Sequence, residues 1–140
     1  MIHWNRFLSL ALILAVPPLV AQAGAPRPDS GGVALIGDWH GESVCLVKPS
    51  ACHDEEALYH ISALPSRPGR FSVRGDKIVN GKPEFMGTLE CDFDARAGIL
   101  HCDFAKGFLN LALSHNRLQG SMYLPDKTRW RDISLTKVKP

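Results

Sequence analysis

The chain has 140 residues, and its 16 basic and 14 acidic side chains give a formal net charge of +2 at pH 7. This near-neutral balance argues against proteins that bind nucleic acid or anionic membranes through a strong positive potential. The length supports one domain with one hydrophobic core rather than two.

Residues 1–23 have the features of a secretory signal peptide. A single positive charge, Arg6, precedes a continuous apolar core over residues 10–16, and residues 21–23 (Ala-Gln-Ala) form a small-x-small cleavage site. The apolar core is far shorter than the roughly 20 residues that a membrane-spanning helix needs. The sequence therefore predicts cleavage after Ala23, export to the periplasm or the cell exterior, and no membrane span.

The chain after the leader divides into a short lead-in and one β domain. Residues 24–33 are rich in proline and glycine, which is typical of a flexible segment. Residues 34–140 show apolar alternation with period two, broken by turn residues, and no convincing helical period. About eight or nine short antiparallel strands predict an all-β fold, either an up-and-down β-barrel of about eight strands or a sandwich. In chain order the predicted strands cover residues 35–47, 57–64, 71–73, 77–79, 85–93, 99–104, 108–113, 118–124 and 129–138.

Four cysteines follow the leader, and an even number of thiols in an exported chain indicates disulfides. A hairpin that turns at residues 96–97 places Cys91 opposite Cys102, with both side chains on the apolar face of their strands. This register predicts a cross-strand bridge between Cys91 and Cys102, and it leaves Cys45 and Cys52 as the second pair. The other two pairings are not excluded by the sequence.

A Gly-x-Trp motif at residues 37–39 lies on the first predicted strand, and Arg131 lies on the last. This arrangement resembles the lipocalin or calycin superfamily, in which such a motif closes one barrel end and an arginine from the final strand packs over the tryptophan. The resemblance implies that Gly37, Trp39 and Arg131 close the barrel, with Arg129 as the competing arginine.

Two further stretches, residues 52–55 and 76–89, look like those of small secreted bacterial proteins with a lipocalin-like domain. The resemblance covers most of the chain after the leader, and no established activity carries over with it. The chain is shorter than typical lipocalins, which implies a shorter barrel with a smaller cavity.

Ligand binding in such a barrel is expected at aromatic side chains of the interior and at polar residues of the mouth. The candidate ligand-binding residues are Tyr59, Phe71, Phe85, Asp76 and Asn80. The asparagine begins an Asn-Gly pair, which is the strongest short hairpin signal and predicts a turn. Eight-stranded barrels are either filled by side chains or hold one small ligand, and composition does not decide between these states.

Metal binding rests on three weak candidate ligands. His53, Asp54 and His60 carry groups that bind zinc or similar ions, but the two histidines have opposite parity along a strand. They converge only if the chain bends between them. Because the chain has no H-E-x-x-H, C-x-x-C or G-x-S-x-G motif, no metal site, cofactor or catalytic residue is predicted.

Two functions of different classes are compatible with these features. The leading hypothesis is an exported, non-catalytic protein that holds a small apolar or amphipathic molecule inside the barrel. The alternative is a module that binds a protein partner, such as a hydrolase inhibitor, through residues 24–33 or through the loops of the rim. Neither the identity of the ligand nor the oligomeric state is predicted.

Overall fold

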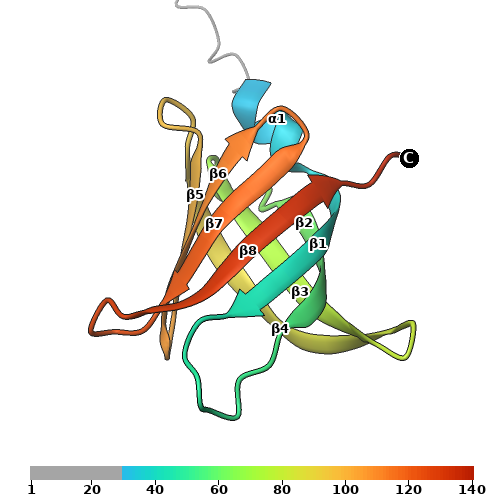
Figure 1. Cartoon of the computed structure of the whole chain (residues 1–140). Coiled ribbons are helices and arrows are strands. Elements are labelled where there is room, and N and C mark those ends of the chain that lie inside the picture. Colours follow the sequence, from blue (N-terminus) through green and yellow to red (C-terminus); the bar gives the residue numbers. More distant parts are fainter. Residues whose placement is uncertain (1–29) are drawn as a thin grey trace, which may run out of the picture.

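The computed structural model describes residues 30–140, which form a closed barrel of antiparallel strands with a short helix at one end (Figure 1). In chain order the elements are α1 (Ser30–Leu35), β1 (Gly37–Cys45), β2 (Glu55–Ala63), β3 (Arg70–Val79), β4 (Lys82–Asp94), β5 (Ile99–Phe104), β6 (Gly107–Ser114), β7 (Arg117–Tyr123) and β8 (Arg129–Lys137). Each strand pairs with the next, and β8 closes the barrel by pairing with β1. The predicted all-β, up-and-down barrel is confirmed, and the sandwich is excluded.

The described chain begins within the predicted flexible segment 24–33, and the predicted signal peptide, residues 1–23, lies outside the described residues. From Ser30 onward the segment is helical, which differs from the flexible lead-in expected there. With six residues, α1 is too short to produce a helical period in the sequence, and a helix of this length depends on tertiary packing. No helix among residues 30–140 is long and apolar enough to span a membrane.

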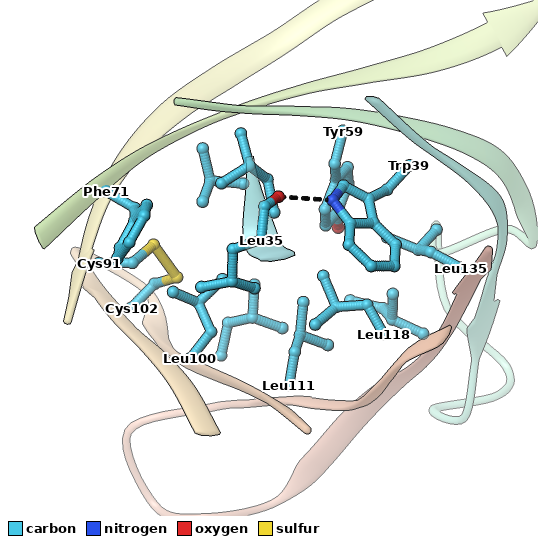
Figure 2. Close-up of a cluster of buried hydrophobic side chains, with 14 of the residues drawn as sticks. Leu35, Trp39, Tyr59, Phe71, Cys91, Leu100, Cys102, Leu111, Leu118 and Leu135 are labelled. Atoms are coloured by element: carbon cyan, nitrogen blue, oxygen red, sulfur yellow. Dashed lines mark hydrogen bonds between the residues drawn. A yellow bond between two sulfur atoms is a disulfide. The ribbon is translucent and has the colours of Figure 1, made fainter. Parts of the chain in front are cut away.

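Leu35 and Trp39 fasten α1 to its end of the barrel. The side chain of Leu35 is fully buried, and its carbonyl oxygen accepts a hydrogen bond of 2.8 Å from Nε1 of Trp39 (Figure 2). Gly32 approaches the ring of Phe71 so closely that a Cβ atom there would lie 3.1 Å from Cζ of the ring. We call this end of the barrel, next to α1, the closed end.

The hydrophobic core is one cluster of buried side chains inside the barrel, and Leu35 of α1 lies among the side chains that the strands contribute (Figure 2). Alternate residues of each strand point inward, as the period of two predicts, and burial of each large apolar side chain stabilises the fold by about 1.5–3 kcal/mol. The largest fully buried hydrophobic side chains are Trp39, Leu35, Leu100, Leu109, Leu111, Leu118 and Leu135.

One continuous strand, β3, replaces the two short strands predicted at residues 71–73 and 77–79. The residues between them, Arg74-Gly75-Asp76, read as a break because glycine and aspartate are depleted in strands. In the structure β3 pairs with β2 without interruption, and its ladder with β4 continues past a register shift. Long-range pairing therefore overrides the local preference of these residues.

The register shift between β3 and β4 is a β-bulge that changes which side chains of β4 face inward. Gly75 pairs with Gly87, whereas Asp76 pairs with Phe85, so Met86 is the additional residue. Because side chains alternate between the two faces of a strand, the additional residue moves residues 82–85 to the face opposite to the one that the alternation of residues 87–93 predicts. Phe85 consequently points away from the barrel interior and is 62% exposed.

Both predicted disulfides are present, and the two alternative pairings are excluded. Cys91 lies opposite Cys102 in the register of β4 and β5, with 4.2 Å between the Cα atoms, and both side chains are fully buried. Cys45 and Cys52 are bridged across the β1–β2 connection, with a Cα–Cα distance of 5.9 Å. Stable disulfides are typical of proteins from oxidising compartments such as the periplasm or the cell exterior.

The double variant Cys91→Ala/Cys102→Ala is expected to lower the free energy of unfolding by about 2–4 kcal/mol, because the bridge restricts the unfolded chain. Urea unfolding followed by far-ultraviolet circular dichroism measures the change. The matched control is Cys45→Ala/Cys52→Ala. We expect a smaller loss there, because that bridge closes a shorter loop and neither cysteine belongs to the hydrophobic core cluster. An equal or larger loss in the control would contradict this account.

Candidate functional site

A cavity of about 580 Å³ occupies the barrel at the end opposite α1. We call this end the open end; the β1–β2, β3–β4, β5–β6 and β7–β8 connections lie there (Figure 1). Most of the cavity wall is apolar, and its large apolar side chains include Val73, Leu89, Phe104, Leu109, Met122 and Trp130.

Gly75 and Gly87 make room for the cavity. They lie directly opposite each other on β3 and β4, and both line the cavity. A Cβ atom added to Gly87 would meet no heavy atom within 4 Å outside the adjacent residues, so this position faces open space. Nearer the closed end the same two strands place Phe71 opposite Cys91, and these buried side chains fill the interior there.

Arg131 is a buried cation in the wall of the cavity, with 8% of its side chain exposed. Its Nη1 donates to the carbonyl oxygen of Ser43 at 3.1 Å and to the hydroxyl of Ser43 at 2.8 Å. Its Nη2 donates to the carbonyl oxygen of His53 at 2.6 Å, and Nη1 lies 3.2 Å from Oε2 of Glu55. The guanidinium therefore ties β8 to β1 and to the start of β2, and Glu55 balances its charge.

The role expected for Arg131 from the family resemblance is wrong in one respect. Arg131 does point inward, but the register of β1 and β8 places it beside Cys45, six residues along β1 from Trp39. The cation over the Trp39 ring is instead Lys137, whose Nζ lies 5.4 Å from the ring centroid and donates to the carbonyl oxygen of Ala34. Arg131 thus stabilises the open end, whereas Lys137 caps the closed end.

Gly37 and Trp39 both lie at the closed end, on β1. Gly37 has a φ of +129°, which L side chains rarely adopt, and a Cβ atom there would lie 3.3 Å from Cε of Lys137. Trp39 is completely buried, with its indole N–H bonded to α1. Arg129, the other arginine that the family resemblance allowed, points outward and pairs with Asp132.

Tyr59 lines the cavity and is only 5% exposed. Burial raises the pKa of its hydroxyl to about 12, while the nearby Arg131 charge lowers the pKa and the Glu55 charge raises it by smaller amounts. At neutral pH the phenol is therefore uncharged and able to donate. Among residues 30–140 its hydroxyl has no hydrogen-bond partner, and because Arg70 Nε is the one fully enclosed side-chain polar atom there without a partner, the hydroxyl is open to the cavity.

The other two aromatic candidates do not line the cavity. Phe71 belongs to the closed-end core and packs edge-to-face on Phe93, with 6.1 Å between the ring centroids. Phe85 lies on the outer surface, where the guanidinium of Arg74 stands 5.1 Å from its ring centroid. The bulge explains this difference, because Met86 takes the inward position and lines the cavity in place of Phe85.

The two polar candidates also lie outside the cavity. Asp76 is on the outer face of β3 but only 2% exposed: Arg74 Nε donates to it at 3.1 Å, and His60 Nε2 lies 3.3 Å away. The other ring nitrogen of His60 lies 2.7 Å from Asp38 Oδ1. Asn80, with a φ of 52°, is part of the β3–β4 turn that the Asn-Gly pair predicts. These residues stabilise the barrel wall and one hairpin.

The three weak metal candidates lie apart. His53 lines the cavity, Asp54 accepts a hydrogen bond of 2.8 Å from the backbone N–H of Cys45, and His60 lies on the outer face. Within the described part of the chain, no three His, Cys, Asp or Glu side chains group closely enough to hold a metal ion. Asp54 instead fixes the entrance to the β1–β2 connection next to the Cys45–Cys52 bridge.

Several cavity residues were not singled out by the sequence. Gly87 does share a face with Leu89 in the alternating pattern, so its inward position was visible, but the gap that it leaves was not. Glu55 and Lys77 have the same parity as the inward-facing Tyr59 and Val73, but charged side chains were not expected in an apolar interior. Met86 lines the cavity because of the bulge, for which periodicity carried no signal.

No protein-family model matches this chain, and a search of curated proteins finds no significant match. The fold and the cavity therefore carry the functional argument by themselves. What they show is an eight-stranded antiparallel barrel, consistent with a lipocalin-like fold, that is filled at one end and hollow at the other.

Proposed function

We propose that this chain is an exported, non-catalytic binding protein of lipocalin-like type, which holds one small apolar or amphipathic molecule inside its barrel. The observation that carries the proposal is the cavity of about 580 Å³ at the open end. Pockets for small ligands are commonly about 300–1,000 Å³, concave and mostly apolar, with a few polar groups. The cavity matches each part of that description.

Export is supported by the two disulfides and by the leader pattern of residues 1–23. A binding role is supported by the way the polar groups of the cavity are used. Arg131 and Glu55 neutralise each other and hold the strands together, which leaves the apolar wall as the main contact surface.

The alternative, a hydrolase inhibitor that acts through residues 24–33 or through the loops of the rim, stays a prediction. Residues 30–33 of that segment belong to α1, which is packed on the closed end. The part of the segment that the structure describes is therefore engaged in the fold. The cavity is the feature that favours the binding protein.

The variant Gly87→Phe is expected to weaken the binding of apolar probes more than tenfold while the barrel still folds. A phenylalanine ring at this position enters open space in the cavity and competes with the ligand for the same volume. Fluorescence titration with the uncharged dye N-phenyl-1-naphthylamine measures the affinity. Strands favour phenylalanine over glycine, so the substitution itself is compatible with β4.

The matched control is Thr88→Phe, which places the same ring one residue along β4 on the exposed face. The control should bind the dye with the affinity of the unmodified protein. Thermal unfolding of both variants tests that each one folds. Undiminished binding by a folded Gly87→Phe protein would show that the ligand site is not this cavity.

A further inference from the structure

Tyr59 presents to the cavity a donor that has no hydrogen-bond partner among residues 30–140. Its side chain is 95% buried by accessible surface, it lines the cavity, and its hydroxyl is unbonded among residues 30–140. The hydroxyl is open to the cavity rather than enclosed by protein, since Arg70 Nε is the one fully enclosed side-chain polar atom without a partner among residues 30–140. A hydroxyl in this position hydrogen-bonds to whatever occupies the cavity, either water or a ligand. This hydroxyl is therefore placed to receive a partner from the contents of the cavity.

The charged groups near Tyr59 are already occupied. Both terminal nitrogens of Arg131 donate to Ser43 or His53, and Glu55 stands against the same guanidinium. An anionic ligand group at this depth would meet the carboxylate of Glu55, and a cationic one would meet Arg131. Burial of a charge without a free partner is costly, so the deep part of the cavity favours an uncharged group.

Lys77 is the other cation of the cavity wall, and it lies nearer the surface. Its side chain is 38% exposed, and its Nζ lies 3.5 Å from Oε2 of Glu84, which is its cross-strand partner on β4. A solvated pair of this kind at the mouth does not supply a buried charge partner. The deep polar contact of the cavity is therefore left to the tyrosine.

We infer that the natural ligand is an uncharged apolar molecule with an oxygen acceptor, such as a ketone, ester or quinone, and that the Tyr59 hydroxyl donates a hydrogen bond to this oxygen. The inference rests on the proposed function and specifies its ligand class. The oxygen enters first and the apolar remainder lies along the wall formed by side chains such as Leu89, Phe104 and Met122. Tyr59 is thereby the residue that makes the cavity bind ligands with an oxygen acceptor more tightly than plain hydrocarbons.

The test uses three naphthalenes of similar shape in competition with N-phenyl-1-naphthylamine. They are 2-acetylnaphthalene, which has a carbonyl oxygen, 2-ethylnaphthalene, which has none, and the anion 2-naphthoate. The unmodified protein should bind the ketone roughly five- to tenfold more tightly than the ethyl compound, the range of one net hydrogen bond. It should bind the anion most weakly.

Tyr59→Phe removes the donor and keeps the ring, so the ketone and the ethyl compound should then bind equally. The control is Tyr123→Phe, which alters the only other tyrosine; that ring is stacked on Phe108, 4.9 Å between centroids, and is not part of the cavity lining. The control should keep the full preference for the ketone. The comparison of the ketone with the ethyl compound uses the unmodified protein alone. It remains a valid test even if one of the two tyrosine variants fails to fold.

Three results would overturn the inference. One is equal binding of the ketone and the ethyl compound by the unmodified protein, and another is a preference that survives Tyr59→Phe. The third is tightest binding of 2-naphthoate with loss of that binding in Lys77→Met, which would place a charged head group at the mouth. If the ketone and the ethyl compound bind equally tightly, only this inference fails. If none of the three naphthalenes binds, the proposed function fails as well.

Discussion

Replacement of Arg131 by methionine is expected to lower the free energy of unfolding by about 3–5 kcal/mol, the usual range when one member of a buried ion pair is removed. Methionine keeps much of the side-chain volume, so the loss reports the missing guanidinium. The carboxylate of Glu55 and the carbonyl oxygens of Ser43 and His53 then lose their partner at a largely buried position. Chemical denaturation at neutral pH measures the loss.

A double-mutant cycle tests the origin of this effect. Glu55→Gln removes the orphaned charge, so Arg131→Met/Glu55→Gln should lose less than the sum of the two single variants, with a coupling of about 1–3 kcal/mol. The control Arg129→Met removes an arginine two residues away whose side chain is 56% exposed, and it should cost about 0–1 kcal/mol. Additive losses, or equal losses at the two arginines, would contradict a buried structural pair.

Trp39→Ala is expected to lower the free energy of unfolding by about 3–5 kcal/mol, because the variant leaves a large void in a packed core. Trp39 is completely buried and contributes the hydrogen bond that joins β1 to α1 (Figure 2). For a domain of this size, a loss of about 3 kcal/mol lowers the melting temperature by roughly 10 °C or more. Calorimetry or circular dichroism at increasing temperature gives this shift.

Trp130→Ala is the matched control for Trp39→Ala, because it removes the same side chain at the open end instead of the closed end. Trp130 lines the cavity at the open end and is only partly buried, so its removal enlarges an existing space. We expect this variant to lose clearly less stability than Trp39→Ala but to change the binding of apolar probes. A melting temperature as low as that of Trp39→Ala would show that the closed end is not the main source of stability.

Local pattern was sufficient for much of the fold. The period of two predicted most strands, the Asn80-Gly81 pair predicted the β3–β4 turn, and parity predicted that Cys91 faces Cys102. All of these depend on neighbours in the chain or on one hairpin. In such cases the residue types and their spacing are enough to predict the strand, the turn or the cross-strand pair.

The candidate site was less predictable, and the reasons are physical. Of the five predicted ligand-binding residues only Tyr59 lines the cavity. Phe85 left the interior because the bulge adds Met86 to β4, and the register shift appears only when β3 and β4 are paired. Asp76 became part of the outer wall because its partners, His60 and Arg74, come from the pairing of β2 with β3 and from β3 itself.

The position of Arg131 shows the same limit. Its inward direction followed from the parity of β8, since Ile133 and Leu135 face the core. Its distance from Trp39 depends on the stagger of β8 against β1, which is set when the barrel closes. A family resemblance placed the arginine over the tryptophan, whereas the stagger assigned that place to Lys137.

For this protein the sequence by itself determined the positions of most strands, the faces of most of their residues and the cross-strand disulfide, because alternation, turns and short-range register are local properties. Only the tertiary structure decided that one end is filled by α1 and the core while the other contains a cavity. That division depends on the pairing of Gly75 with Gly87 and on the Arg131 contacts, which bring together residues distant in the chain. Interior volume is a sum over all eight strands, so no single stretch of sequence contains it.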